Sequence, residues 1–236
     1  MRYLVYASQS KVAMLYPQIP GGCRGTRGGM IGLDLKFAKA EFSSSTNKDD
    51  RFFEQLWEVE DWIYRFEEVG TIDEPKTWIH LRGDVTAANF TSSPFRSYDA
   101  PPDMSEEAVI FAARDDTGNR LLLGGSGYHL ISCSQFGSFD SSWKQPLYFS
   151  SSLGLLRLFE TYRDDIGHPV PEHDRPLPRS EAGEVVARTC DEVLSGGRIL
   201  SQQLGTCDLL AKRLATYSTD DGVTTLATPL TVALLD

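Results

Sequence analysis

The segment 124–129 brings together the residue types with the most chemistry in this chain. It reads Gly-Gly-Ser-Gly-Tyr-His. Glycines let a ligand approach backbone N–H groups, Ser126 offers a hydroxyl, and His129 can act as a general acid or base. On an extended strand these two side chains point to opposite faces, so a direct pair requires a bulge between them. Two interpretations stay open: a ligand-contacting segment with Gly124 and Gly125 at the site, or a twisted strand whose histidine donates to a carbonyl.

A second group of polar side chains lies in the segment 77–83. Alternation along a strand places Trp78, His80 and Arg82 on one face and apolar residues on the other. An aromatic ring, an imidazole and a guanidinium side by side can line a polar pocket or a partner surface. His80 and Arg82 are therefore candidate ligand-binding residues. The alternative is an amphipathic edge strand whose outer face is solvated.

Two further groups of residues have weaker patterns. The glycine-rich loop 21–29 contains Arg24 and Arg27, but it lacks the Gly-Lys-Ser/Thr ending of a phosphate-binding P-loop and is interpreted as a surface loop. His168 and His173 are metal-ligand types at a spacing that matches no standard site. The cysteines form no C-x-x-C pair. We expect neither a metal nor a cofactor.

Charge and composition exclude several classes of protein. The chain has 236 residues, 41% of them hydrophobic, and a net charge of −10. This composition is typical of a globular chain, and the acidity argues against a broad nucleic-acid-binding surface, which requires Lys and Arg. No run of about 18 apolar residues and no signal peptide is seen, so we expect no membrane association and a cytoplasmic location with reduced thiols.

The apolar pattern of the first half predicts elements that would hold these residues. Strands are expected at 2–7, 33–37 and 77–83, and helices at 9–17 and 49–69. A hairpin is expected from 108–112 and 120–123 around the turn 115–119, with its second strand running on through residue 131. The clearest helix is 49–69, because its apolar residues recur at intervals of four and three.

The second half is expected to be more helical. Helices are predicted at 150–163, 180–196 and 200–214, with an irregular connector at 165–179. The last of these helices depends on a stripe formed by Leu200, Leu204, Cys207, Leu210 and Leu214. A closing strand follows over 223–234, interrupted by Pro229, which is tolerated only at an edge or a bulge.

Together these elements predict the fold class. Strands and helices are mixed without a strict βαβ repeat. We therefore expect an α+β fold with a mixed, largely antiparallel sheet and helices packed mainly on one face. Residues 1–236 are expected to form a single domain, with the connector around 165–179 as its irregular part.

Four separated segments, at residues 2–20, 69–75, 124–131 and 226–233, carry a resemblance to a known family. They resemble an uncharacterised family from high-GC Gram-positive bacteria, catalogued as a domain of unknown function. The resemblance runs from end to end and implies one domain. It also implies a second histidine beside His129, where this chain has Tyr128. A histidine pair that binds metal is therefore not expected, and the family implies no established activity.

These observations lead to two main competing functions, and a third, a nucleic-acid or nucleotide reader using Arg24, Arg27 and Lys36, ranks below them because the chain is acidic. The first is a ligand- or protein-binding regulatory module of undetermined specificity, acting in a bacterial stress or defence pathway. The second is a small-molecule enzyme sited at the segment 124–129, in which His129 is the acid or base, Arg82 holds an anion and Ser126 hydrogen-bonds the substrate. The partner expected is a small molecule or a protein, and the sequence leaves both enzymatic activity and oligomeric state open.

Overall fold

The computed structural model describes residues 2–23, 48–92, 106–131, 179–196, 201–219 and 221–235. Several predictions lie outside these residues. They are the strand 33–37, the helix 150–163, nearly all of the connector 165–179 with its two histidines, and the two arginines of the glycine-rich loop.

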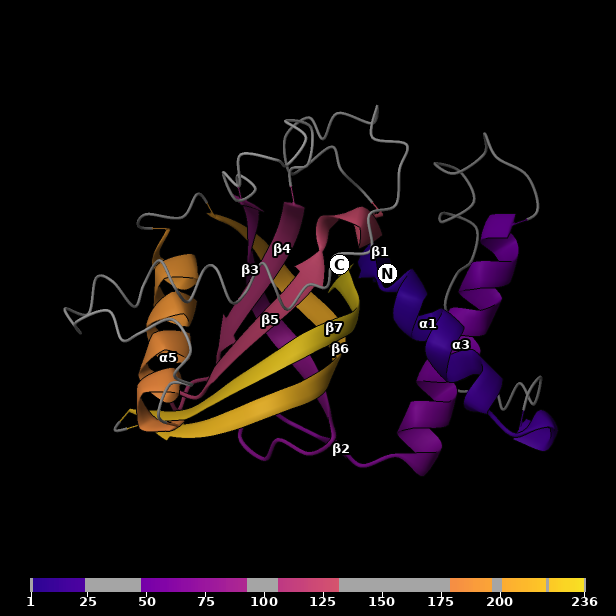
Figure 1. Cartoon of the computed structure of the whole chain (residues 1–236), viewed down its shortest axis with the longest axis horizontal. Helices are drawn as coiled ribbons and strands as arrows, with labels where there is room; N and C mark the ends of the chain where they lie inside the picture. The colour runs from indigo at the N-terminus through magenta and orange to yellow at the C-terminus, as the bar shows by residue number, and fades with distance from the viewer. Residues whose placement is uncertain are drawn as a thin grey trace, which may run out of the picture.

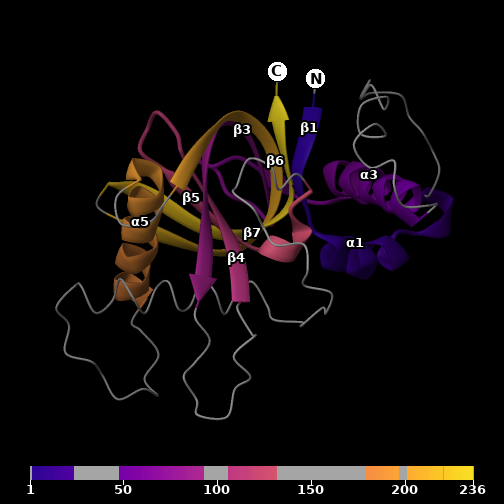
Figure 2. The same cartoon turned by 90° about the horizontal axis from the view of Figure 1, so that it is seen from above.

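Seven described strands form one mixed sheet that curls into a barrel (Figures 1 and 2). They are β1 (Arg2–Ala7), β2 (Val69–Gly70), β3 (Trp78–Ser92), β4 (Glu106–Arg114), β5 (Arg120–Ser126), β6 (Ser201–Thr219) and β7 (Gly222–Leu235). The pairs β3–β4, β4–β5, β5–β7, β7–β6 and β6–β3 close a ring. All are antiparallel except β5–β7. Closure gives the long strands β3, β6 and β7 a partner on both sides.

The remaining two strands extend this ring. β1 pairs antiparallel with the C-terminal half of β7, beyond the residues of β7 that pair with β5. The short β2 pairs parallel with the start of β3. β7 therefore contacts three strands and lies in the middle of the sheet, so the edge position considered for it was wrong. Pro229 lies beside a register shift between Leu210 and Ala211, which confirms the bulge.

Side chains alternate between the inside and the outside of the barrel. The inward residues form one core that includes Phe111, Leu121, Leu123, Cys207 and Leu209. The residues between them point outward and meet the helices. Because both faces of β5 are buried, Leu121, Leu122 and Leu123 form a continuous apolar run.

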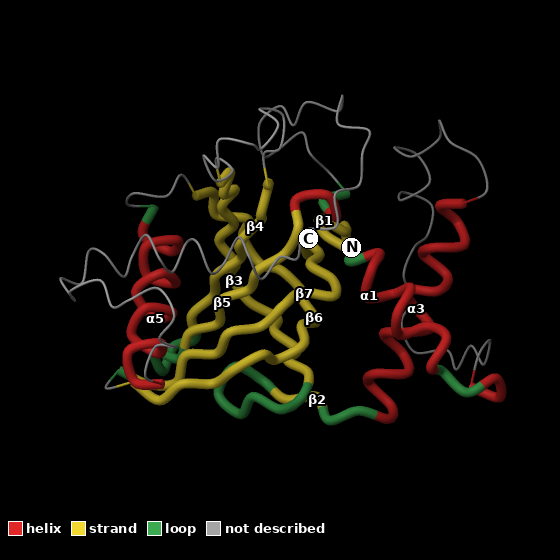
Figure 3. The backbone as a smooth tube through the Cα atoms, viewed as in Figure 1, coloured by secondary structure: helices red, strands yellow, loops and turns green. Residues whose placement is uncertain are grey.

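Two helices cover one outer side of the barrel (Figure 3). α1 (Gln9–Leu15) and α3 (Lys48–Phe66) pack together and onto the outward side chains of Trp78, Leu210 and Leu230. The helix predicted at 49–69 is confirmed, although it ends at residue 66. The helix predicted at 9–17 is confirmed as α1, followed by a 3₁₀ turn at Tyr16–Gln18.

A third helix, α5 (Arg179–Ser195), covers a separate part of the outer face. Val186, Cys190 and Val193 pack against Ile110 and Leu122 of the barrel wall. Thus α1, α3 and α5 all lie on the outer face, and the inner face holds a core of side chains. The α+β class is confirmed. None of the described helices is long and apolar enough to cross a membrane.

One predicted element was wrong. Within the helix predicted at 200–214, residues 201–214 belong to the strand β6 instead. Cys207, Leu209 and Ala211 point into the barrel while Leu210 points out toward α3. Pairing with β3 and β7, strands distant in sequence, fixes this segment as a strand despite its helix-like spacing.

Candidate functional site

The segment 124–129 leaves the sheet earlier than the sequence predicted. β5 ends at Ser126, and residues Gly127–His129 form a 3₁₀ turn. The chain then returns beside β1, where the Ile131 N–H donates to the Val5 carbonyl at 2.8 Å. This turn, which the expectation of a continuous strand missed, brings His129 against the N-terminal residues.

The two strand glycines are buried, and a tyrosine approaches one of them closely. A Cβ added to Gly125 would lie 2.8 Å from the ring and hydroxyl of Tyr6. The Gly124 carbonyl accepts a hydrogen bond from the Thr228 hydroxyl at 3.1 Å. The close approach expected at these glycines is therefore made by a side chain of the barrel core. The prediction that Gly124 and Gly125 bind a ligand stays a prediction.

His129 stands at the end of a chain of side chains that runs back to α1. Its Nε2 lies 3.3 Å from the Ser10 hydroxyl. The Ser10 hydroxyl lies 3.3 Å from the Ser8 hydroxyl. The Lys11 ammonium donates to the Ser8 hydroxyl, also at 3.3 Å. Four polar side chains, which we call the Lys–Ser–Ser–His cluster (Lys11, Ser8, Ser10 and His129), are thus connected end to end.

Local structure explains why these residues meet. Ser8 is the N-cap of α1 and accepts from the Lys11 backbone N–H at 3.5 Å. An N-cap serine places its hydroxyl over the first turn, next to residues two and three positions later. The Ser8 backbone N–H is anchored on the Leu230 carbonyl of β7 at 2.8 Å. The His129 ring packs edge-on against Tyr6, with ring centroids 5.9 Å apart.

Tyr6 links the cluster to the barrel interior. Its side chain is 1% exposed. Its hydroxyl hydrogen-bonds the Ser8 side chain and the Ser126 backbone, and burial raises its pKa above the usual value. Ser126 is half-buried and reaches the cluster through this backbone contact. Of the two catalytic candidates, the structure places His129 within the cluster and Ser126 beside it.

Burial changes the titration of both ionisable ends of the cluster. It lowers the pKa of Lys11 to about 8, because the ammonium loses part of its hydration. Burial also lowers the pKa of His129 to about 4, and the nearby Lys11 charge adds to this effect. The imidazole is therefore neutral at pH 7, and the amine changes charge slightly above it.

His80 and Arg82 belong to a different part of the molecule. His80 Nε2 lies 2.9 Å from Asp208 Oδ1, and its ring packs edge-on against Tyr64 of α3. The exposed Arg82 is paired in register with Asp208 and lowers the pKa of its carboxyl, after the larger effect of His80. Both residues share the outer face with Trp78, as predicted. However, Trp78 is buried beneath the helices at 2% exposure.

This second group joins a buried ion pair. The Arg2 guanidinium makes two hydrogen bonds with the Glu60 carboxylate, at 2.8 and 3.0 Å. Arg2 also approaches Asp208, at 3.9 Å. Arg2 begins β1, whereas Tyr6 lies near its end. The two groups of predicted site residues therefore lie near opposite ends of one strand, and the structure does not bring Arg82 to His129.

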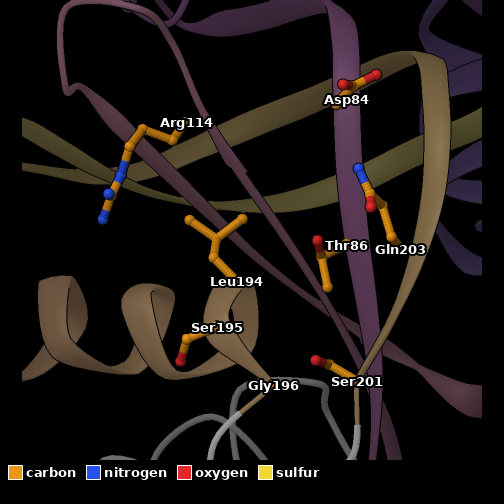
Figure 4. Close-up of a pocket in the computed structure, with 8 residues that line it drawn as sticks. All are labelled: Asp84, Thr86, Arg114, Leu194, Ser195, Gly196, Ser201 and Gln203. Atoms are coloured by element: carbon orange, nitrogen blue, oxygen red, sulfur yellow. The ribbon is translucent and has the colours of Figure 1, made fainter.

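A pocket of about 380 Å³ lies elsewhere, between the end of α5 and strands β3, β4 and β6 (Figure 4). Its lining is Asp84, Thr86, Arg114, Leu194, Ser195, Gly196, Ser201 and Gln203. The Arg114 guanidinium pairs with Asp191 of α5. None of the site residues predicted from the sequence lines this pocket. Among the described residues, no group of three His, Cys, Asp or Glu side chains is placed to hold a metal ion.

Sequence reasoning missed Ser8, Ser10 and Lys11. One signal for them was present: Ser-Gln-Ser-Lys follows the strand 2–7 directly, and a serine between a strand and a helix is a typical N-cap. Their proximity to His129 was not visible, because it depends on a contact across 119 positions of sequence.

Comparison with known proteins adds a family and no activity. A family model described as "Family of unknown function (DUF7019)" matches residues 2–236. No curated protein and no solved structure matches the chain significantly.

Proposed function

The chain belongs to this family of unknown function, and we propose that it is a binding module for a small anionic ligand held by the Lys–Ser–Ser–His cluster. The observation that carries the proposal is the position of the Lys11 ammonium. It is hydrogen-bonded to Ser8 and connected through Ser10 to His129.

Lys11 is a half-buried cation that lacks a counter-charge in the described part of the chain. No described carboxylate lies within ion-pair distance of it, and burial is the one cause of its lowered pKa. A desolvated charge without a partner is costly, so a site of this kind favours an anion.

The other members of the cluster provide hydrogen bonds to the same ligand. Ser10 is exposed and carries a hydroxyl that can donate to an anionic oxygen. The neutral His129 ring can donate from one nitrogen when its tautomer allows it. Ser8 is 0% exposed and holds Lys11 in place rather than contacting a ligand. The site therefore suits one small group with phosphate or carboxylate oxygens.

The experiment is a calorimetric titration with inorganic phosphate at pH 7. Wild-type protein should release heat on binding, and Lys11→Met should abolish the signal. Met keeps the apolar stem and removes the charge. Lys76→Met is the matched control, because Lys76 is exposed and lies outside the cluster, and it should bind as wild type does. Equal isotherms for wild type and Lys11→Met would overturn the proposal.

The biological setting proposed with this site comes from the sequence. It is a regulatory module in the cytoplasm of a high-GC Gram-positive bacterium, acting in stress or defence, with a small molecule as its partner. The acidity supports a partner other than nucleic acid. The buried Cys190 and Cys207 are free thiols, as a reducing compartment would leave them.

A second candidate function is the small-molecule enzyme sited at the segment 124–129. It is favoured by the contact between His129 and the Ser10 hydroxyl, because a hydroxyl beside a neutral imidazole is an arrangement found in nucleophilic catalysis.

A further inference from the structure

We propose that Ser10 is the nucleophile of an acyl-transfer reaction, activated by Lys11 through the Ser8 hydroxyl and positioned by His129. The inference rests on the site of the proposed function, and it makes that site the centre of an enzyme whose substrate is a small ester or amide. The anion that the site binds is then the carboxylate product of that substrate.

The geometry of three consecutive hydrogen bonds carries the inference. Lys11 Nζ, Ser8 Oγ, Ser10 Oγ and His129 Nε2 follow one another at 3.3 Å each. A serine hydroxyl is weakly nucleophilic unless a base removes its proton, and serine–lysine arrangements serve this purpose on unrelated folds. Here the base reaches the nucleophile through a second hydroxyl, which accepts one proton while it donates another.

Exposure separates the roles of the two serines. Ser10 is exposed, so a substrate carbonyl can reach it, whereas Ser8 is 0% exposed and is enclosed by Tyr6, Lys11 and Ser10. A buried hydroxyl at the N-cap has a fixed position, which suits a proton relay. His129, packed edge-on against Tyr6, then donates from Nε2 to the Ser10 oxygen and fixes its direction.

Titration distinguishes the two candidate bases. A general base works best when its pKa lies near the operating pH. The pKa of Lys11 is about 8, while that of His129 is about 4, so Lys11 is the stronger base. The His129 imidazole on the 3₁₀ turn is affected by the Lys11 charge, and the Tyr6 phenol on β1 hydrogen-bonds Ser8; both are neutral at pH 7. The carboxylates of α3, which packs against α1, have no resolved effect on Lys11.

The steps balance with water as the co-reactant. Ser10 Oγ bonds to the acyl carbon while its proton passes to Ser8 and the Ser8 proton passes to neutral Lys11. The bond from the acyl carbon to the leaving group breaks, and the leaving group takes the proton back through Ser8. Water then attacks the acyl carbon and the bond to Ser10 breaks; one water proton passes to Ser10 Oγ and the other passes through Ser8 to Lys11. The product carboxylate remains beside protonated Lys11.

A fluorophosphonate probe tests this directly, because a nucleophilic serine displaces its fluoride and stays phosphonylated. Wild-type protein, checked by intact mass and peptide mapping, should be labelled at Ser10. The rate should rise about tenfold from pH 7 to pH 9, as the Lys11 amine with its pKa of about 8 loses its proton. Lys11→Met should slow labelling by about 100-fold.

Three variants complete the experiment. Ser10→Ala should abolish labelling, and Ser218→Ala, which removes an exposed serine of β6, should leave it unchanged. His129→Gln should slow labelling and keep the pH profile, because the base is unchanged. Thermal melts of each variant show that it is folded. An unlabelled wild type, or a rate that is independent of Lys11, overturns the inference.

The labelling experiment and the phosphate titration test different claims, so each can fail without the other. Lys11-dependent phosphate binding without labelling of Ser10 overturns the nucleophile and leaves the binding module standing. Labelling of Ser10 without phosphate binding supports the nucleophile and overturns the anion site.

Discussion

The Tyr6 ring occupies the space that a side chain at residue 125 would need. A Cβ at Gly125 would lie 2.8 Å from two ring carbons and from the hydroxyl oxygen of Tyr6, closer than non-bonded atoms approach. Tyr6 in turn packs edge-on against both His129 and Phe111. The glycine therefore determines where Tyr6 lies, and Tyr6 helps to determine where His129 lies.

Gly125→Ala should destabilise the protein by about 2–3 kcal/mol, because Tyr6 is buried and its ring cannot move without disturbing the core. Gly83→Ala on β3 is the matched control. Its nearest atom would be Leu81 Cδ1 at 3.6 Å, an ordinary contact, so its effect should stay within about 0.5 kcal/mol. Urea unfolding of the three proteins measures both effects, and equal losses for the two variants would contradict this explanation.

The buried Arg2–Glu60 pair should hold α3 against the barrel. Glu60 is 4% exposed and also accepts from the Thr231 hydroxyl at 2.6 Å. Glu60→Ala leaves Arg2 desolvated without its main partner, so we expect a loss of about 3–5 kcal/mol in denaturant unfolding.

The adjacent residue of the same helix provides a control for this effect. Asp61 pairs with Arg65 at 2.9 Å, and both side chains are about half exposed, at 46% and 40%. Asp61→Ala should cost at most about 0.5 kcal/mol. A loss in Glu60→Ala as small as that in Asp61→Ala would show that the buried pair does not stabilise the helix.

His129 should make the protein sensitive to acid. Its folded pKa of about 4 lies below the ordinary value of 6.5, so the unfolded chain takes up a proton first as pH falls. Stability contributed by the neutral ring is therefore present above pH 6.5 and is lost between pH 6.5 and pH 4. His129→Gln should lose less unfolding free energy than wild type over this window, measured by urea unfolding at several pH values. Parallel pH curves would argue against a buried neutral imidazole.

The cysteines should differ in their reactivity. Burial raises the pKa of Cys190 and of Cys207 to about 12, whereas Cys23 is half-buried. Iodoacetamide reacts with the thiolate, so it should alkylate Cys23 in the native protein and reach the other two only in denaturant. Peptide mass spectrometry shows which thiols are modified, and native alkylation of Cys190 would contradict its placement in the core.

The sequence predicted elements wherever the local pattern determined the structure. The stripe of α3 was readable because Leu56, Val59 and Ile63 recur at helical spacing, and all three are buried. The β4–β5 hairpin was readable because Asp115 forms its turn, accepting from the Thr117 and Asn119 N–H groups at 2.9 and 2.8 Å. These signals are local, so they do not depend on the rest of the fold.

Prediction failed where distant segments determined the structure. β6 resembles a helix because Leu210 faces α3 while Leu209 faces the barrel interior, which hides the alternation of a strand. Asp221-Gly222, between segments rich in threonine, was the local signal for the β6–β7 hairpin. Similarly, the site required His129 to meet Ser10, and no local pattern encodes that contact.

The anion site is tested by the pKa of the Lys11 amine, measured by NMR of its side chain with and without inorganic phosphate. We expect a pKa of about 8 without phosphate, and a higher value when phosphate is bound, because an anion stabilises the charged amine. A pKa near 10.5 that phosphate leaves unchanged would contradict the site described here.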